Sequence, residues 1–236
     1  MVKTNVTSDL HGNLPEYVED FDLMLICGDI CPARNHYYSY QKEWIENEFV
    51  EWVSKLPFRN PWSKVVITPG NHDFVFEYWK KEDYDNLTRL TSGRLIVLRN
   101  EEYDFEYIDE YTGEVGSLKI FGTPYCQIFG NWAFMRSPEV LEEKLSKIPD
   151  NVDILISHSS PSIEKYGVIN DARYPKDAGC PVLAKAIKEK KPRYAFYGHI
   201  HSGDHTFKTV GDTKMANVSL VNEQYDDVND VLKLYI

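Results

Sequence analysis

VVITPGNHDF, residues 65–74, changes character in its middle. Its first four residues are apolar or β-branched, which predicts a buried β-strand. A proline and a glycine then end the strand. The next three residues carry an amide, an imidazole and a carboxylate: Asn71, His72 and Asp73. Because α/β proteins place functional loops at the carboxyl ends of their strands, this stretch predicts a functional loop at a sheet edge.

The same plan recurs at four further places along the chain. Short apolar runs bounded by Gly or Pro are typical of strands buried on both faces. Here such runs end in groups able to bind a metal ion or a phosphate: Asp9, His11, Asp29, His158, His199 and His201. Most of the histidines therefore follow a predicted strand. His36 and His205 do not, and they are interpreted as ordinary surface or loop residues.

Helical patterns separate the predicted strands. Apolar residues at positions 45, 49, 53 and 56 form one helix face, and Pro57 ends that helix. Further helices are predicted within residues 137–149 and 179–192, and a β-hairpin within residues 101–121. Residues 206–236 are typical of two or three further strands. The alternation predicts an α/β fold, and the lack of a linker predicts a single domain over residues 1–236.

Composition limits the partners. The formal net charge of −11 disfavours a non-specific grip on duplex nucleic acid, which depends on Lys and Arg. It does not exclude a small phosphorylated substrate, because a bound metal ion can dominate the local field. No apolar run approaches the length that crosses a membrane, and the amino terminus lacks the apolar stretch of a signal peptide. We therefore expect a cytoplasmic protein with reduced thiols at Cys27, Cys31, Cys126 and Cys180.

The polar strand ends together predict a metal site. In extended backbone, residues i and i+2 point the same way, so Asp9 with His11, and His199 with His201, are each expected to offer two ligands to one place. A nitrogen and oxygen set without thiolate favours Mn, Fe or Zn. The candidate ligands are too many for one ion and suit two: Asp9, His11, Asp29, Asn71, His158, His199 and His201. Two such ions clamp the oxygens of a phosphoryl displacement and generate hydroxide near neutral pH.

Five short blocks carry a resemblance to a known family. In chain order they are SDLHG, GD, GNHD, SH and GHIH, at residues 8–12, 28–29, 70–73, 157–158 and 198–201. They resemble the ordered motifs of calcineurin-like metallophosphoesterases. The resemblance implies a four-layer αββα sandwich of two mixed sheets flanked by helices. It also implies that one metal ion binds Asp9, His11 and His201, while the other binds Asn71, His158 and His199.

The same resemblance implies roles at the centre of the site. Asp29 would bridge the two ions, and a hydroxide between them would attack phosphorus. Asn71 and His72 would contact the phosphate, and His72 would protonate the leaving group. Asp73 is expected to support the loop.

A closer resemblance concerns the substrate. GNHDFVFE, FGTPYCQIFGNWAF and VSLVNEQY resemble segments of the metallophosphoesterase domain-containing proteins, a subfamily associated with hydrolysis of phosphodiesters, including 2′,3′-cyclic nucleotides. This implies a phosphodiesterase that acts on a small nucleotide-type diester. Two departures, SHSSP and the pair Tyr125 and Cys126, leave the expected ligands untouched but put the substrate pocket in question.

Several alternatives stay open. The same site could serve a phosphomonoesterase or a nuclease, or the chain could be a non-catalytic metal-binding scaffold. Pro69 and Asp73 replace the Arg and Glu that flank GNH in protein Ser/Thr phosphatases, which argues against that branch. Tyr37, Tyr38, Tyr40 and Trp132 could stack on a nucleobase, but aromatics at such spacing are more often core and stay outside the predicted site. The native metal and the oligomeric state are open.

Overall fold

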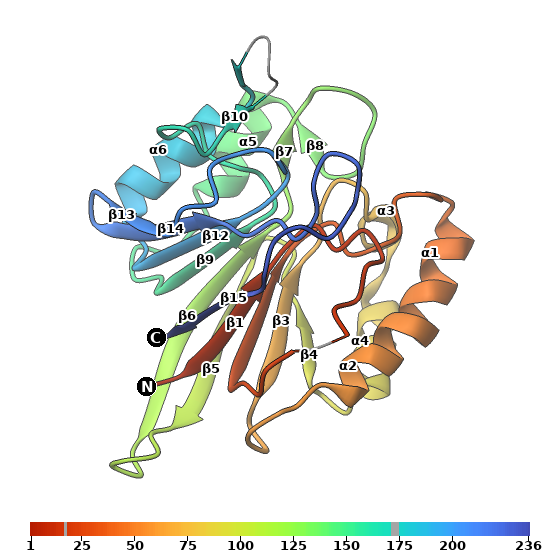
Figure 1. Ribbon diagram of the computed structural model, residues 1–236, viewed down its shortest axis with the longest axis vertical. Coiled ribbons are helices and arrows are strands. Elements are labelled where there is room, and N and C mark those ends of the chain that lie inside the picture. Colours follow the sequence, from red (N-terminus) through yellow and green to blue (C-terminus); the bar gives the residue numbers. More distant parts are fainter. Residues whose placement is uncertain (17, 171–174) are drawn as a thin grey trace.

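The computed structural model describes residues 1–16, 18–170 and 175–236. Within these ranges, two large mixed sheets lie face to face and helices cover their outer faces (Figure 1). The first sheet has the strand order β15-β1-β2-β3-β4. Its strands are β1 (Lys3–Thr7), β2 (Leu23–Cys27), β3 (Lys64–Thr68), β4 (Leu95–Val97) and β15 (Leu232–Tyr235).

The second sheet has the order β13-β14-β12-β9-β6-β5. Its strands are β5 (Glu101–Ile108), β6 (Val115–Thr123), β9 (Ile154–Ser157), β12 (Tyr194–Tyr197), β13 (Lys208–Val210) and β14 (Thr213–Asn217). The inner strands of both sheets pair in parallel, while β15, β13 and β5 pair antiparallel at the edges. The β5–β6 hairpin confirms the hairpin prediction, and β13, β14 and β15 confirm the strands expected in the tail.

Two groups of helices cover the sheets. The first group is α1 (Tyr38–Trp44), the π-helical turn η1 (Ile45–Phe49), α2 (Val50–Lys55), α3 (Phe74–Tyr78) and α4 (Lys81–Leu90). The second is α5 (Pro138–Leu145) and α6 (Pro181–Lys190). α1, η1 and α2 continue one another and end before Pro57, as the periodicity predicts. The sequence did not predict α3 and α4. Short strand pairs complete the described fold: β7 (Cys126–Gln127) with β8 (Met135–Arg136), and β10 (Val168–Ile169) with β11 (Lys176–Asp177).

Apolar side chains fill the spaces between successive layers. Leu25 of β2 packs between the two sheets with Phe196 of β12, whereas the adjacent Ile26 packs toward the first helical group. On the far side of the second sheet, Tyr197 packs with Leu183 of α6. Neighbouring residues of one strand thus enter different apolar layers, which is why these strands have continuous apolar runs. The layering confirms the αββα sandwich.

Buried Tyr166 makes the fold sensitive to alkaline pH. Its hydroxyl donates to the backbone carbonyls of Thr206 (2.8 Å) and Met215 (3.2 Å). Burial raises the pKa of Tyr166 from 10.0 to about 12. A group whose pKa is raised by folding stabilises the native state fully below its unfolded pKa, and this contribution is lost as the pH rises from 10 through 12.

Tyr166→Phe is therefore expected to lose about 1 kcal/mol of unfolding free energy at pH 7, because the hydrogen bonds are removed. Between pH 10 and 12 the variant should lose stability less steeply than the wild type. Urea unfolding at several pH values measures both effects. Equal slopes for the two proteins would contradict the assignment.

Candidate metal centre

Loops that follow five inner strands meet at one edge of the two sheets (Figure 1). β1 leads into Asp9 and His11, and β2 into Asp29. β3 leads to Asn71 and His72, β9 to His158, and β12 to His199 and His201. Because these strands run parallel within each sheet, their carboxyl ends deliver all the predicted site residues to the same region.

One group of candidate ligands surrounds Asp9. The Nε2 atom of His201 lies 3.3 Å from Asp9 Oδ1 and 3.3 Å from His11 Nε2. Asp9 Oδ1 and His11 Nε2 are 4.0 Å apart. Asp9, His11 and His201 can therefore offer one ligand atom each to a shared ion.

Asp29 stands between this group and a second one. Its Oδ2 atom lies 3.6 Å from His11 Nε2 and 3.4 Å from His158 Nε2. His158 Nε2 is in turn 2.8 Å from Asn71 Oδ1. One carboxylate thus faces imidazole nitrogens that belong to both predicted ligand sets.

His199 reaches the centre differently. Its backbone N–H donates to both carboxylate oxygens of Asp9, at 3.1 and 3.0 Å. Its ring lies beside the ring of His158, with 4.9 Å between centroids, and beside Phe129 at 5.2 Å. The ring is thus on the side of the centre where His158 and Asn71 lie.

The electrostatics of the site fit a divalent cation. Burial, together with the negative charges of Asp73 and Asp9, raises the pKa of Asp29 well above its usual range. Burial also lowers the pKa of His11, His158 and His199, so these imidazoles are neutral and offer lone pairs near pH 7. His11 Nδ1 is buried without a hydrogen-bond partner. A cation among these residues would relieve the repulsion between carboxylates and use nitrogen and oxygen ligands suited to Mn, Fe or Zn.

The backbone of the ligand loops is strained. Asp9, His11, Asp29 and His199 have φ angles of 54°, 46°, 50° and 72°, in the left-handed region that side chains other than glycine rarely adopt. The expectation that Asp9 and His11 converge because their backbone is extended is therefore wrong. Both residues instead have left-handed φ angles, and Asp9 Oδ1 still lies 4.0 Å from His11 Nε2. The same correction applies to His199, whose ring lies against His158 while His201 faces Asp9.

Two motif glycines are required by close approach. A Cβ atom at Gly28 would collide with the ring of His158, and one at Gly198 would collide with the Asp9 carboxylate and with Ser8. Each glycine therefore leaves the space that a candidate ligand from another strand occupies.

The loop after β3 is held from several sides. Both carboxylate oxygens of Asp73 accept backbone N–H groups, those of Ile30, Cys31 and Gly70, at 2.8 to 3.1 Å. This confirms that Asp73 supports the loop. The backbone N–H of His72 donates to Asp29 Oδ1 at 2.7 Å, and His72 Nε2 lies 4.0 Å from Asp29 Oδ2. Burial lowers the pKa of His72 to about 3.

A family model of the calcineurin-like phosphoesterases matches residues 2–203. The chain belongs to the calcineurin-like phosphoesterase family. This is a family of phosphoester hydrolases that typically depend on two metal ions. The strand-end residues described above thus form the candidate metal centre of this family member.

Curated relatives agree with the family. The chain is 28% identical over 204 residues to human metallophosphoesterase domain-containing protein 1, covering 77% of this chain and 56% of that protein. It is 27% identical over 227 residues to UPF0046 protein T07D4.2 of Caenorhabditis elegans, covering 89% of this chain and 53% of that protein. The chain therefore spans about half the length of these relatives.

Solved structures show the same fold. One aligns with a TM-score of 0.61 at 17% identity, over 92% of this chain and 90% of the other. The phosphopantetheinyl hydrolase of Mycobacterium tuberculosis aligns with a TM-score of 0.53 at 13% identity, over 94% of this chain and 90% of that one. At these identities the likeness extends to the fold and no further.

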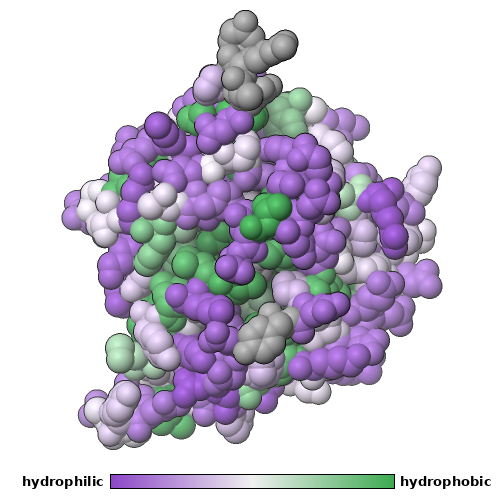
Figure 2. Space-filling view, in the orientation of Figure 1, coloured by the Kyte–Doolittle hydropathy of each residue, from purple (hydrophilic) through white to green (hydrophobic). Residues whose placement is uncertain are grey.

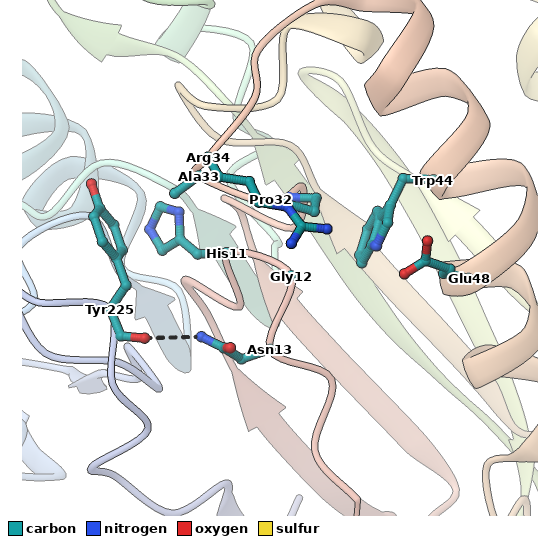
Figure 3. Close-up of a pocket in the computed structure, with 9 residues that line it drawn as sticks. All are labelled: His11, Gly12, Asn13, Pro32, Ala33, Arg34, Trp44, Glu48 and Tyr225. Atoms are coloured by element: carbon teal, nitrogen blue, oxygen red, sulfur yellow. Dashed lines mark hydrogen bonds between the residues drawn. The ribbon is translucent and has the colours of Figure 1, made fainter.

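A cavity of about 410 Å³ opens beside the candidate metal centre (Figure 3). His11 and Tyr225 line one side, Trp44 and Glu48 lie on the other, and the Arg34 side chain extends between them (Figure 3). The ring of Tyr225 meets that of His11 edge-on with 4.6 Å between centroids, and the Tyr225 carbonyl accepts a hydrogen bond from Asn13 Nδ2 at 3.1 Å. The cavity combines polar and apolar walls within reach of a predicted metal ligand, as substrate pockets do.

The sequence pattern did not reveal two residues that contact the candidate site. His36 was interpreted as an ordinary surface or loop residue, but its Nε2 atom lies 2.9 Å from His72 Nδ1. Trp132, left outside the predicted site, stacks on the ring of His72 with 4.4 Å between centroids. His36 lies in the loop that follows Asp29, and Trp132 lies in the segment FGTPYCQIFGNWAF, but neither position by itself indicated a contact with His72.

The surface is largely hydrophilic, as expected for a chain in which 27% of the residues are charged. Figure 2 shows a face that is mostly hydrophilic, with smaller hydrophobic areas near its centre. Among the described residues, none of the helices combines the length and the apolar character that spanning a bilayer requires.

Proposed function

We propose that this phosphoesterase is a phosphodiesterase that uses two divalent metal ions to cleave a small nucleotide-type diester. Asp9, His11 and His201 would hold one ion, and Asn71, His158 and His199 the other, with Asp29 between them. One observation carries the proposal. The Oδ2 atom of Asp29 lies 3.6 Å from His11 Nε2 and 3.4 Å from His158 Nε2, so one carboxylate is within reach of both ligand sets.

Divalent ions held there would polarise the phosphate and would lower the pKa of a water molecule to near neutral pH. The protein's own groups would do the rest. Asn71 and His72 would contact the phosphate. The negative charge of the bound phosphate would raise the pKa of His72, which burial lowers to about 3, and His72 Nε2 would then deliver a proton to the leaving oxygen. Manganese, iron and zinc all suit the nitrogen and oxygen ligands. We propose that manganese supports the activity.

The cavity beside His11 supports a diester. A phosphodiester carries an organic group on each side of phosphorus, and about 410 Å³ is enough for the group that is not in contact with His72. The net charge of −11 supports a small substrate over a long duplex.

We also propose that residues 1–236 form one domain.

The cysteines support a reducing location. Cys27, Cys31, Cys126 and Cys180 are all free and buried. Free thiols are typical of cytoplasmic proteins, so we propose that the enzyme works in the cytoplasm.

The test compares bis-p-nitrophenyl phosphate with p-nitrophenyl phosphate after chelation and after addition of Mn²⁺. We expect chelation to remove activity, Mn²⁺ to restore it, and kcat/KM to favour the diester by roughly tenfold or more. 2′,3′-Cyclic nucleotides are the next substrates. Preference for the monoester would replace the proposal by a phosphomonoesterase on the same site. No hydrolysis of either ester by the metal-loaded protein would favour a binding scaffold.

A further inference from the structure

We propose that His36 is a positioning residue for the proposed reaction, which holds the imidazole of His72 with its Nε2 atom toward the metal centre. The contact that carries this inference joins His36 Nε2 to His72 Nδ1 at 2.9 Å. The inference rests on the proposed function, in which His72 acts on the leaving oxygen.

Stacking fixes the plane of the His72 ring but not its direction. Trp132 lies against the ring with 4.4 Å between centroids and 29° between planes, and His11 meets it edge-on at 4.9 Å. A half-turn of the imidazole about its bond to Cβ would leave that plane unchanged and would exchange nitrogen for carbon at each position. Only a polar partner distinguishes the two directions. His36 is that partner, because it bonds Nδ1 on one side while Nε2 lies 4.0 Å from Asp29 Oδ2 on the other.

The hydrogen bond also decides which nitrogen serves the substrate. A bond between two imidazole nitrogens needs one proton, which either ring can supply. In both cases Nδ1 of His72 is engaged with His36. Nε2 of a neutral His72 carries the proton when His36 Nε2–H donates to His72 Nδ1, and this is the arrangement in which His72 can deliver a proton to the leaving oxygen.

The adjacent carboxylate does not fill this role. In hydrolytic sites a carboxylate often orients the catalytic imidazole. Asp73 follows His72 in the chain, but its oxygens accept the backbone N–H groups of Ile30, Cys31 and Gly70. Asp73 thus orders the loop, and the imidazole of His36 takes the orienting position.

His36 is itself held in place. Its ring lies 5.2 Å from that of Trp132 and 5.6 Å from that of Phe74, and it is partly buried. Five residues later, Gln41 donates to the carbonyl of His72 at 2.7 Å and accepts from the backbone N–H of Val75 at 3.0 Å. One segment around the start of α1 therefore holds both the side chain and the backbone of His72.

Kinetics of two substitutions test the inference. His36→Phe keeps an aromatic ring but removes the hydrogen bond, while His36→Gln keeps a group that can donate or accept. With bis-p-nitrophenyl phosphate and Mn²⁺, we expect His36→Phe to lower kcat about 10- to 100-fold with KM changed by less than about twofold. Bound metal, measured by elemental analysis, should not change. His36→Gln should recover most of the loss. Asn35→Ala, which removes the bond from the Tyr37 N–H to Asn35 Oδ1 in the same loop, is the matched control and should stay close to the wild type.

A double-mutant cycle separates positioning from a general structural effect. If His36 acts through His72, then His36→Phe should cause no further loss of kcat in a His72→Ala background. An equal fold-loss in both backgrounds would overturn the inference. So would a His36→Phe variant with wild-type kcat.

A second readout does not depend on activity. In protein labelled with ¹⁵N-histidine and loaded with diamagnetic Zn²⁺, nitrogen–proton correlations report which nitrogen of His72 carries the proton. We expect one dominant tautomer in the wild type and a mixture in His36→Phe. Identical His72 spectra would overturn the inference even in an active enzyme. Altered spectra in a protein that hydrolyses no ester would support the positioning role while the proposed function failed.

Discussion

Asp29→Ala is expected to remove most of the bound metal and to lower metal-dependent hydrolysis by on the order of 10³-fold or more, since metal ions contribute several kcal/mol to such reactions. The reason is geometric. Asp29 Oδ2 faces His11 Nε2 at 3.6 Å and His158 Nε2 at 3.4 Å, so its loss weakens both proposed ion sites at once. Elemental analysis after dialysis against limiting Mn²⁺, together with the diester assay, measures both effects.

Two variants make the test specific. Asp29→Asn keeps the side-chain volume and the acceptor for the His72 N–H, so it separates loss of the charge from collapse of the loop. Asp22→Asn changes another buried carboxylate, which accepts from the Lys3 N–H and from Arg59. The metal content of the Asp22→Asn variant should equal that of the wild type. Undiminished metal content in Asp29→Ala would rule out the bridging role.

His72→Ala is expected to keep both metal ions and to lower kcat by about 10²- to 10⁴-fold, the usual contribution of a general acid or base. His72 Nε2 is 4.0 Å from Asp29 Oδ2, and the proposed function gives it contact with the phosphate rather than with an ion. His72→Phe is the matched variant, because it keeps a ring to stack on Trp132 but carries no nitrogen. Both variants should lose activity to a similar extent.

Loss of metal from His72→Ala would indicate that His72 is itself a metal ligand. The ligand atoms of His11, Asp29 and His72 all lie within 4.8 Å of one another, so His72 could instead bind an ion. Loss of about one metal ion per protein in His72→Ala would assign it to the metal and remove it from the role of proton donor.

The sequence predicted those features that depend on which residues directly follow one another in the chain. Apolar runs that end in Asp, Asn or His predicted the strands, the edge of the sheet and the residues that gather there. β2, β3 and β12 are buried on both faces, so their apolar runs were long enough to recognise. α3 was missed because it is only five residues long, and α4 because its apolar face is narrow within a strongly polar segment.

The sequence by itself determined which chemical groups stand at the ends of the strands, because residue type and order are local properties. Only the tertiary structure decided how those groups face one another. Asp9 and His11 converge although both have left-handed backbone rather than that of an extended strand. His36 meets His72 across a separation of 36 residues, and Trp132 stacks on the same ring from another loop. Such contacts depend on the distances between folded segments, and no local pattern of residues encodes those distances.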